Sequence, residues 1–209
     1  VPKSLSNCKM LQILDLSKNK MNQTFPAWLG SLPRLQVLLL HSNMFHGEIG
    51  SPRNPSEFPR LCIINLSHNF FTGALPVNYI QIWNAMKAFR TNMEPYIKTG
   101  LNFEKKIGFY TVTYNFTYYS SMILTNKGVE TEYQKILNIF TAIDLSSNKF
   151  TGKIPKSLGS LVALQLLDLS NNNLIGPIPL SLGNLTQLES LDLSQNKLSG
   201  VIPDQLAAQ

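Results

Sequence analysis

The chain has 209 residues, of which 44% are apolar and 14% are charged, and its formal net charge is +6. This apolar content excludes a disordered chain. Because the densest basic run is the pair Lys105-Lys106, the charge predicts a mildly basic surface and no nucleic-acid partner. The sequence contains no run of about 18 apolar residues, which is the length needed to cross a bilayer. Two cysteines, Cys8 and Cys62, are too few for a disulfide scaffold or a metal site, so we expect both thiols to be free and buried.

The pattern Leu-x-x-Leu-x-Leu-x-x-Asn first runs from Leu11 to Asn19. It starts again at Leu35, Leu61, Phe140, Leu164 and Leu188, so successive starts lie 24, 26, 79, 24 and 24 residues apart. A 24-residue period predicts a leucine-rich-repeat solenoid, because one coil cannot bury its leucines and stacked coils share a core. We expect short parallel β-strands on its concave face. We also expect each Asn amide to satisfy backbone groups of adjoining coils.

A second signature, Gly-x-Ile/Leu-Pro, follows four of these asparagines. It occupies residues 73–76, 152–155, 176–179 and 200–203. The first two repeats depart from it, and the second carries two extra residues, which predicts irregular convex sides there. Repeat and signature together resemble the plant-specific class of leucine-rich repeats. That class is found in the extracellular parts of plant receptor kinases and receptor-like proteins.

The 79-residue interval exceeds one period by about 55 residues, which we assign to an inserted island at 85–138. Residues 110–125 alternate between apolar and polar side chains, which predicts a half-buried strand that bends near Ser120-Ser121. A turn at 126–128 and a second alternation at 129–133 predict a β-hairpin. The predicted organisation is therefore repeats at 1–84, a β-rich island at 85–138 and three further repeats at 139–209.

Tyr118, followed after eight residues by Lys127-Gly128, resembles a motif in the islands of plant receptor-like proteins and peptide-hormone receptor kinases. The resemblance implies that the island takes part in ligand recognition and in binding a co-receptor kinase, with Tyr118, Lys127 and Gly128 as co-receptor residues. The structural alternative is that Tyr118 fills the island core and Lys127 is an ordinary turn residue.

One concave position holds Asp in four repeats, at Asp15, Asp144, Asp168 and Asp192, but Leu39 and Asn65 in the other two. Without these two charges, the concave face of the second and third repeats is a more apolar strip. The aromatic side chains of the island could cover it, because rigid aromatic side chains bury a large area at low entropic cost. We therefore predict ligand contact at a set of strip and island residues. These are Val37, Leu39, His41, Ile63, Tyr110, Tyr114 and Tyr119.

Catalysis is not expected, because the repeat period accounts for four of the five aspartates. The three histidines, His41, His46 and His68, also have no partners at metal or triad spacing. No cofactor or metal is predicted. Four Asn-x-Ser/Thr sequons agree with a secreted protein. The predicted glycosylation sites are Asn22, Asn115 and Asn184, with Asn65 the weakest because it stands in the concave row.

Both ends stop within a repeat, so we expect a piece of a longer ectodomain, on the extracellular side of a single-pass plasma-membrane protein. The predicted function is that of a plant immune receptor-like protein. Its expected partners are a peptide, protein or small-molecule ligand, a leucine-rich-repeat co-receptor kinase and an adaptor receptor kinase. Two alternatives remain: a receptor kinase for a peptide or steroid hormone, and a secreted inhibitor of microbial cell-wall hydrolases, although such inhibitors lack an island.

Overall fold

The computed structural model describes residues 1–88, 97–107, 110–119, 122–126, 129–137 and 140–207. Two compact units are formed: Val1–Phe89 with Thr141–Gln209, and Arg90–Phe140. The first unit extends past the expected boundary at residue 84, because Met86 is fully buried and its carbonyl accepts a hydrogen bond from Ala163 N at 3.1 Å. We call the first unit the solenoid and the second the inserted unit.

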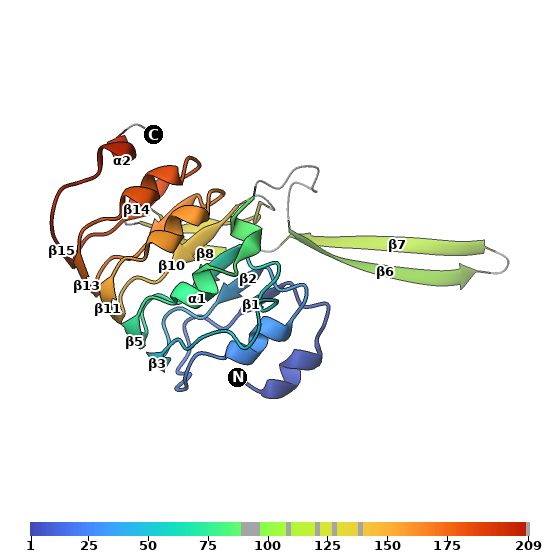
Figure 1. The fold of residues 1–209 in the computed structure, drawn as a ribbon. Helices are drawn as coiled ribbons and strands as arrows, with labels where there is room; N and C mark the ends of the chain where they lie inside the picture. The colour runs from blue at the N-terminus through green and yellow to red at the C-terminus, as the bar shows by residue number, and fades with distance from the viewer. Residues whose placement is uncertain (89–96, 108–109, 120–121, 127–128, 138–139, 208–209) are drawn as a thin grey trace. The chain divides into compact units, whose positions relative to one another are not determined.

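Six parallel strands form the main sheet of the solenoid, one strand from each predicted repeat (Figure 1). In spatial order they are β1 (Ile13–Asp15), β2 (Val37–Leu39), β4 (Ile63–Asn65), β10 (Ala142–Asp144), β12 (Leu166–Asp168) and β14 (Ser190–Asp192). Neighbouring strands pair at the same repeat position, as in Leu14↔Leu38. The predicted leucine-rich-repeat solenoid is confirmed.

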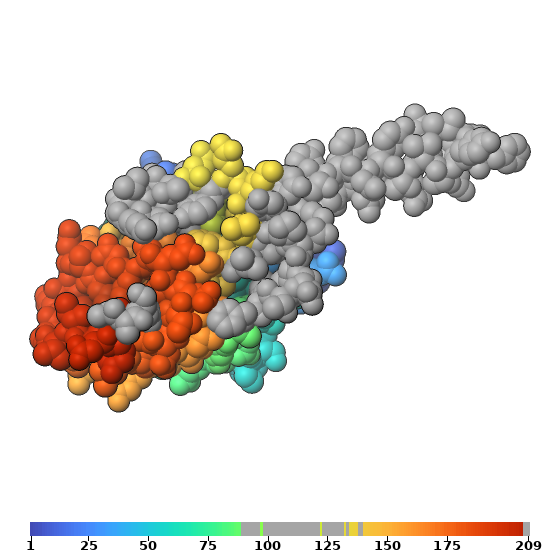
Figure 2. Space-filling view, turned by 90° about the horizontal axis from the view of Figure 1, so that it is seen from above, coloured from blue at the N-terminus to red at the C-terminus, as the bar shows by residue number. Residues whose placement is uncertain are grey.

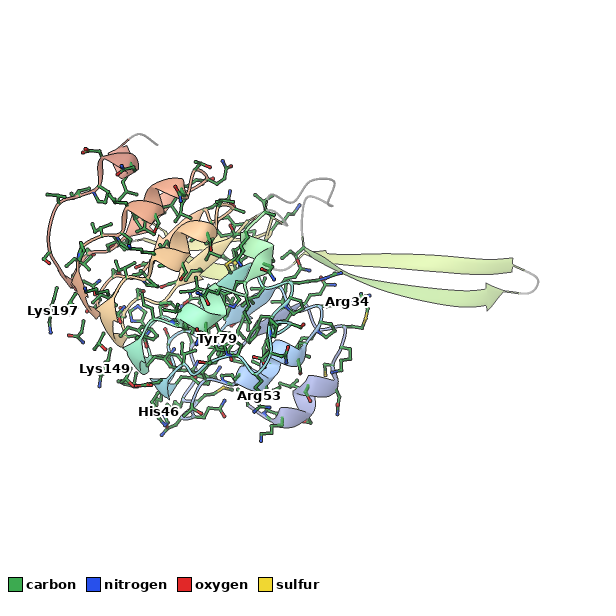
Figure 3. All side chains as sticks on the ribbon, in the orientation of Figure 1. Arg34, His46, Arg53, Tyr79, Lys149 and Lys197 are labelled. Atoms are coloured by element: carbon green, nitrogen blue, oxygen red, sulfur yellow. The ribbon has the colours of Figure 1, made fainter. Side chains whose placement is uncertain are left out.

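The structure also contains a second parallel sheet, which the sequence did not predict. Its strands follow the repeat asparagines of five coils. Its strands are β15 (Lys197–Leu198), β13 (Asn173–Gly176), β11 (Lys149–Lys153), β5 (Phe70–Ala74) and β3 (His46–Glu48). Gly152 within this sheet has φ of +79°, which a side chain would disfavour. His46, Lys149 and Lys197 mark this side of the molecule (Figure 3). The first coil has no strand here among the described residues, in line with its irregular sequence.

Short helices cover the remaining side of the coils. They are η1 (Lys3–Asn7), η2 (Ala27–Ser31), α1 (Val77–Ile80), η3 (Asn84–Met86), η4 (Lys156–Ser160), η5 (Leu180–Asn184) and α2 (Asp204–Ala207). Consecutive helices pack closely, since a Cβ added to Gly159 would lie 2.1 Å from Ser181 O. The second coil has a loop instead of a helix over residues 49–62, as its insertion predicts.

The solenoid continues without a break across the insertion. β4 pairs directly with β10, with Ile64 opposite Ile143. The rings of Phe71 and Phe150 stack with centroids 6.2 Å apart. In Figure 2 the later coils, orange to red, form one continuous surface. Residues on either side of the insertion therefore belong to one hydrophobic core.

Five of the six repeat asparagines link two coils, as the sequence predicted, whereas Asn19 Nδ2 donates to Leu16 O and Ser17 O of its own coil. Asn69 Nδ2 donates to Leu40 O at 3.0 Å in the preceding coil and to Leu66 O at 3.1 Å in its own coil. Its Oδ1 accepts from Phe45 N at 2.9 Å. Four further asparagines make the same kind of contact with the preceding coil: Asn43, Asn148, Asn172 and Asn196. These amides satisfy backbone groups that would otherwise be buried without partners.

The described part of the inserted unit contains two antiparallel pairs of strands. β6 (Lys98–Ile107) pairs with β7 (Tyr110–Tyr119), and β8 (Met122–Asn126) pairs with β9 (Val129–Tyr133). The pairing of β8 with β9 confirms the β-hairpin that the alternating sequence predicted. β6 was not predicted, because residues 98–107 hold Gly, Asn and four charged side chains without regular alternation.

The two cysteines differ in environment. Cys62 is buried at the start of β4, and its Sγ donates to Gln36 O at 3.3 Å. Cys8 forms no disulfide, but the prediction that it is buried is wrong, because it is exposed. It caps the end of η1, at a turn whose side chains face solvent.

Candidate ligand-binding surface

The last residues of the six main-sheet strands form one row across the solenoid. In spatial order the row reads Asp15, Leu39, Asn65, Asp144, Asp168 and Asp192. The pairing register places each residue directly opposite its neighbour in the next coil. The break in the aspartate row is therefore a real feature of one surface, spanning two adjacent strands, β2 and β4.

The polar members of the row each close a small turn. Asp144 Oδ1 accepts from Ser146 N at 3.0 Å and from Ser146 Oγ at 2.7 Å. Asn65 makes the matching pair of bonds with Ser67 at 2.9 and 2.7 Å. An uncharged amide can thus replace the carboxylate without loss of hydrogen bonds. Leu39 has no such acceptor, so only the second coil lacks this turn.

Burial makes the carboxylate at the centre of the row unusual. Asp144 is fully buried, and burial, together with the nearby Asp168 carboxylate, raises its pKa to about 7. Its Oδ2 is buried and has no hydrogen-bond partner among the described residues. Burial likewise raises the pKa of Asp168. The carboxylates of the later coils therefore crowd each other, and a neutral Asn65 next to Asp144 limits that repulsion.

The structure brings the four candidate solenoid residues together. Val37 stands opposite Ile63, Leu39 stands opposite Asn65, and His41 follows β2. Their exposed fractions are 0% for Val37, 1% for Leu39, 5% for His41 and 0% for Ile63. As it stands, this strip therefore offers little surface to a ligand, which the sequence alone could not show.

The tyrosine candidates lie on one strand of the inserted unit. Tyr110, Tyr114, Tyr118 and Tyr119 all belong to β7, where Tyr118 pairs with Thr99 and Tyr119 with Lys98 of β6. Lys127 and Gly128 lie outside the described residues, although Asn126 and Val129 on either side of them pair with each other. Of the predicted motif, the structure therefore describes Tyr118, near the end of β7.

The sequons fall in different environments. Asn22 and Asn184 are exposed, as are the threonines two residues after them. Asn65 is only 2% exposed and its Oδ1 is bound to Ser67, so a glycan has no room there in the folded chain. Asn115 lies within β7.

No group of three or more His, Cys, Asp or Glu side chains within the described ranges is arranged to hold a metal ion. None of the helices described above is long and apolar enough to span a membrane.

Sequence comparison identifies the repeats and their relatives. The family model for the Leucine Rich Repeat matches residues 10–32, 140–161, 163–185 and 187–208. The chain is 47% identical over 164 residues to Receptor-like protein 43 of Arabidopsis thaliana, covering 78% of this chain and 21% of that protein. It is 48% identical over 167 residues to Receptor-like protein 34 of the same plant, covering 80% and 16%. The chain thus spans about a fifth or less of these relatives.

Similar solved structures are plant receptor ectodomains. The plant peptide hormone receptor RGFR1, solved in complex with RGF2, matches with a TM-score of 0.68 and 26% identity. That match covers 99% of this chain and 24% of RGFR1. The Arabidopsis receptor kinase HAESA, solved with the peptide hormone IDA and the co-receptor SERK1, matches with a TM-score of 0.65 and 27% identity over all of this chain and 25% of HAESA.

Proposed function

The chain belongs to the plant leucine-rich-repeat receptor-like proteins, and on this premise we propose that it recognises a ligand and docks a co-receptor on the extracellular side of the plasma membrane. The observation that carries this proposal is its likeness to RGFR1 and HAESA. Both of those ectodomains match almost the whole chain, and both were solved with a peptide hormone. HAESA was solved with a co-receptor as well.

Ligand contact is assigned to the broken aspartate row and to the inserted unit. Leu39 and the neutral Asn65 leave an apolar strip with Val37 and Ile63, and His41 stands at its end. Because the strip is almost completely buried, the proposal requires that it becomes accessible when the ligand binds. The tyrosines of β7 (Tyr110, Tyr114 and Tyr119) supply aromatic contact area.

Co-receptor docking is assigned to Tyr118, Lys127 and Gly128 together with the three coils after the insertion. A tyrosine beside an ammonium group can anchor an interface, since aromatic and cationic side chains supply most hot spots. The later coils are regular and share one continuous core, so they provide a rigid platform. A glycine without a side chain lets a partner approach the backbone closely.

An immune receptor without its own kinase is our preferred assignment, and a receptor kinase for a peptide or steroid hormone is the alternative within the same class. The first would signal through an adaptor receptor kinase. A secreted inhibitor of cell-wall hydrolases is disfavoured, because the solenoid is interrupted by a second compact unit. The sequence that follows Gln209 in the gene separates these cases: a membrane span without a kinase supports the first.

The functional test measures association of the full-length protein with the SERK1 ectodomain. The measurement is made with and without fractions of microbial or plant extracts that elicit a response in plant cells. We expect association that depends on the eliciting fraction and saturates with it. Association at the same strength without any fraction, or none with every active fraction, contradicts a ligand-dependent receptor. A protein that instead inhibits a microbial hydrolase would belong to the inhibitor class.

A further inference from the structure

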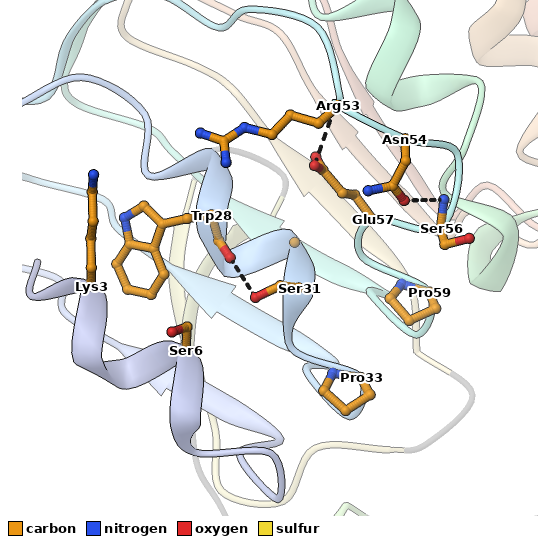
Figure 4. A pocket seen from close by; sticks show the side chains of 11 residues that line it. Lys3, Ser6, Trp28, Ser31, Pro33, Arg53, Asn54, Ser56, Glu57 and Pro59 are labelled. Atoms are coloured by element: carbon orange, nitrogen blue, oxygen red, sulfur yellow. Dashed lines mark hydrogen bonds between the residues drawn. The ribbon is translucent and has the colours of Figure 1, made fainter.

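A hollow of about 500 Å³ lies on the convex side of the first coils, and none of the residues assigned above lines it. Its lining comes from three segments: η1, η2 with the turn after it, and the loop of the second coil (Figure 4). Small-molecule sites in proteins span about 300–1,000 Å³. Figure 4 shows the Trp28 ring with Lys3 on one side and the Arg53 side chain above it.

Trp28 is a departure from the repeat. The second residue of each corresponding helix is Ser4 in η1, Asn78 in α1, Ser157 in η4, Ser181 in η5 and Gln205 in α2. A polar residue therefore suffices for packing at this position. The Trp28 side chain is only partly buried, so part of its ring remains available to a ligand.

Arg53 is a second departure, since it lies in the loop that replaces a helix in the second coil. The loop is held in place by Glu57, whose Oε1 accepts from Arg53 N at 3.1 Å and whose Oε2 accepts from Tyr79 OH at 3.3 Å. Phe58 N also donates to Gly30 O at 2.9 Å. The loop is thus ordered before any ligand arrives, which lowers the entropic cost of binding.

The charge that faces the hollow is positive. Glu57, its acidic lining residue, is 5% exposed and accepts bonds from within the protein. Lys3 and Arg53 are both exposed. The hydroxyl and amide groups of Ser6, Ser31, Asn54 and Ser56 complete the polar lining. A ligand that fits must therefore carry negative charge and many hydroxyl groups.

We propose that this hollow binds an acidic oligosaccharide, with one sugar ring stacked on Trp28 and carboxylates paired with Lys3 and Arg53. Charged hydrogen bonds to carboxylates are strong, and Arg binds them in a bidentate manner. A second hollow of about 310 Å³ shares Arg53 and Asn54 with the first, so an extended chain of sugars can continue past the loop.

An acidic peptide is the competing occupant, and the lining disfavours it. No Leu, Ile, Val, Met or Phe side chain lines the 500 Å³ hollow, so an apolar anchor residue has no pocket there. The segments that line it are short helices and a loop. They therefore offer no strand edge to which a peptide could add.

The test is calorimetric titration of the full-length protein with a hexamer of a uronic acid, a neutral hexamer with the same linkage, and an acidic hexapeptide. We expect the uronate hexamer to bind, with affinity that falls as salt rises. Trp28→Ser, which restores the residue of the other coils, should weaken binding at least about tenfold, as loss of an aromatic anchor does. Lys3→Gln with Arg53→Gln should have a similar effect. Lys156→Gln, an exposed cation on η4, is the matched control.

Binding can also be followed by fluorescence, because the chain has two tryptophans and Trp83 is only 1% exposed. A change on adding the uronate hexamer that disappears in Trp28→Ser places the sugar on this ring. No uronate binding at millimolar concentration, equal affinity for the neutral hexamer, or tighter binding of the peptide overturns the proposal. Each of these results leaves the receptor function untouched, because that function rests on other surfaces.

Discussion

The coils after the insertion and the coils before it share the same sheet and asparagine bonds. They differ in the residues that end their strands and in their helices. β10, β12 and β14 all end in Asp, and the helices η4 and η5 repeat with the same sequence spacing. Before the insertion, two of three strands have lost that Asp, one coil has a loop in place of its helix, and one helix carries Trp28. The asparagine bonds are the same in both regions.

Because the framework does not change, the variation in the early coils has no structural cause in the repeat itself. The later coils show what stacking alone requires: leucines inside, an asparagine between coils, and a glycine where helices meet. Residues that depart from this set are free to serve recognition. We therefore propose that the early coils and the inserted unit serve recognition and that the later coils form a supporting platform.

Gly159→Ala should give the largest effect on stability, because the new Cβ would lie 2.1 Å from Ser181 O, a backbone atom that cannot move aside alone. We expect a loss of about 3 kcal/mol or more in the free energy of unfolding. Gly50→Ala, in the irregular loop of the second coil, is the control, since nothing lies within 4 Å of its Cβ. Denaturant unfolding of both variants measures the difference. Equal losses would show that the later coils are no more tightly constrained than the loop.

Asp144→Asn should stabilise the protein at neutral and alkaline pH. Burial raises the pKa of Asp144 from 3.8 to about 7, so the folded chain binds a proton that the unfolded chain has released. Stability from this group is therefore greatest below about pH 4, falls as pH rises to about 7, and stays low above it. We expect a gain on the order of 2 kcal/mol at pH 8 and a flatter pH profile.

The control for this prediction is Asp192→Asn, at the same position in a partly exposed coil. Both changes create a sequon, so the proteins are made in a host that does not glycosylate. The amide at 144 keeps both bonds to Ser146, as Asn65 does with Ser67. A pH profile that is unchanged by Asp144→Asn but altered by Asp192→Asn would place the titration elsewhere.

Leu39→Asp with His41→Ser converts the second coil to the Asp-Leu-Ser sequence of the later coils. The fold should survive, because the same residues form a turn at Asp144 and Ser146. Ligand affinity should fall about tenfold, as expected for loss of a central interface contact. The reverse change in a regular coil, Asp192→Leu with Ser194→His, should leave affinity unchanged. If the two folded double variants have the same ligand affinity, the early coils contribute no more to recognition than the later coils do.

Glycosylation should follow exposure and change stability least. We expect glycans at Asn22 and Asn184, which are exposed, and none at Asn65, which is 2% exposed. Asn115 is expected to be occupied from its sequon. Glycopeptide mass spectrometry of the protein secreted from plant cells gives the occupancy. A fully occupied Asn65 would mean that this coil opens during maturation.

The sequence predicts most features that recur, although it missed the second parallel sheet, which recurs in five coils. The period gave the main sheet and the role of asparagines such as Asn69, because every coil repeats the same requirement. The β8–β9 hairpin followed from alternation. Strand β6 was not predicted, because it forms by pairing with β7 and its own residues show no alternating pattern. The burial of Leu39 and the hollow beside Trp28 depend on segments distant in sequence. Trp28 and the two-residue insertion were the only local signs of that hollow.

The measurement that tests the account most directly is the affinity of the ligand-bound, full-length protein for the SERK1 ectodomain, with and without Tyr118→Ala and Lys127→Ala together. We expect the double variant to lose about 1–3 kcal/mol of co-receptor binding, the range for an interface anchor, while ligand binding changes less. Hydrogen exchange across β8 and β9 confirms that the inserted unit stays folded. Normal co-receptor binding by the folded double variant would contradict docking at this motif, and equal loss of both affinities would show that Tyr118 belongs to the core of the inserted unit.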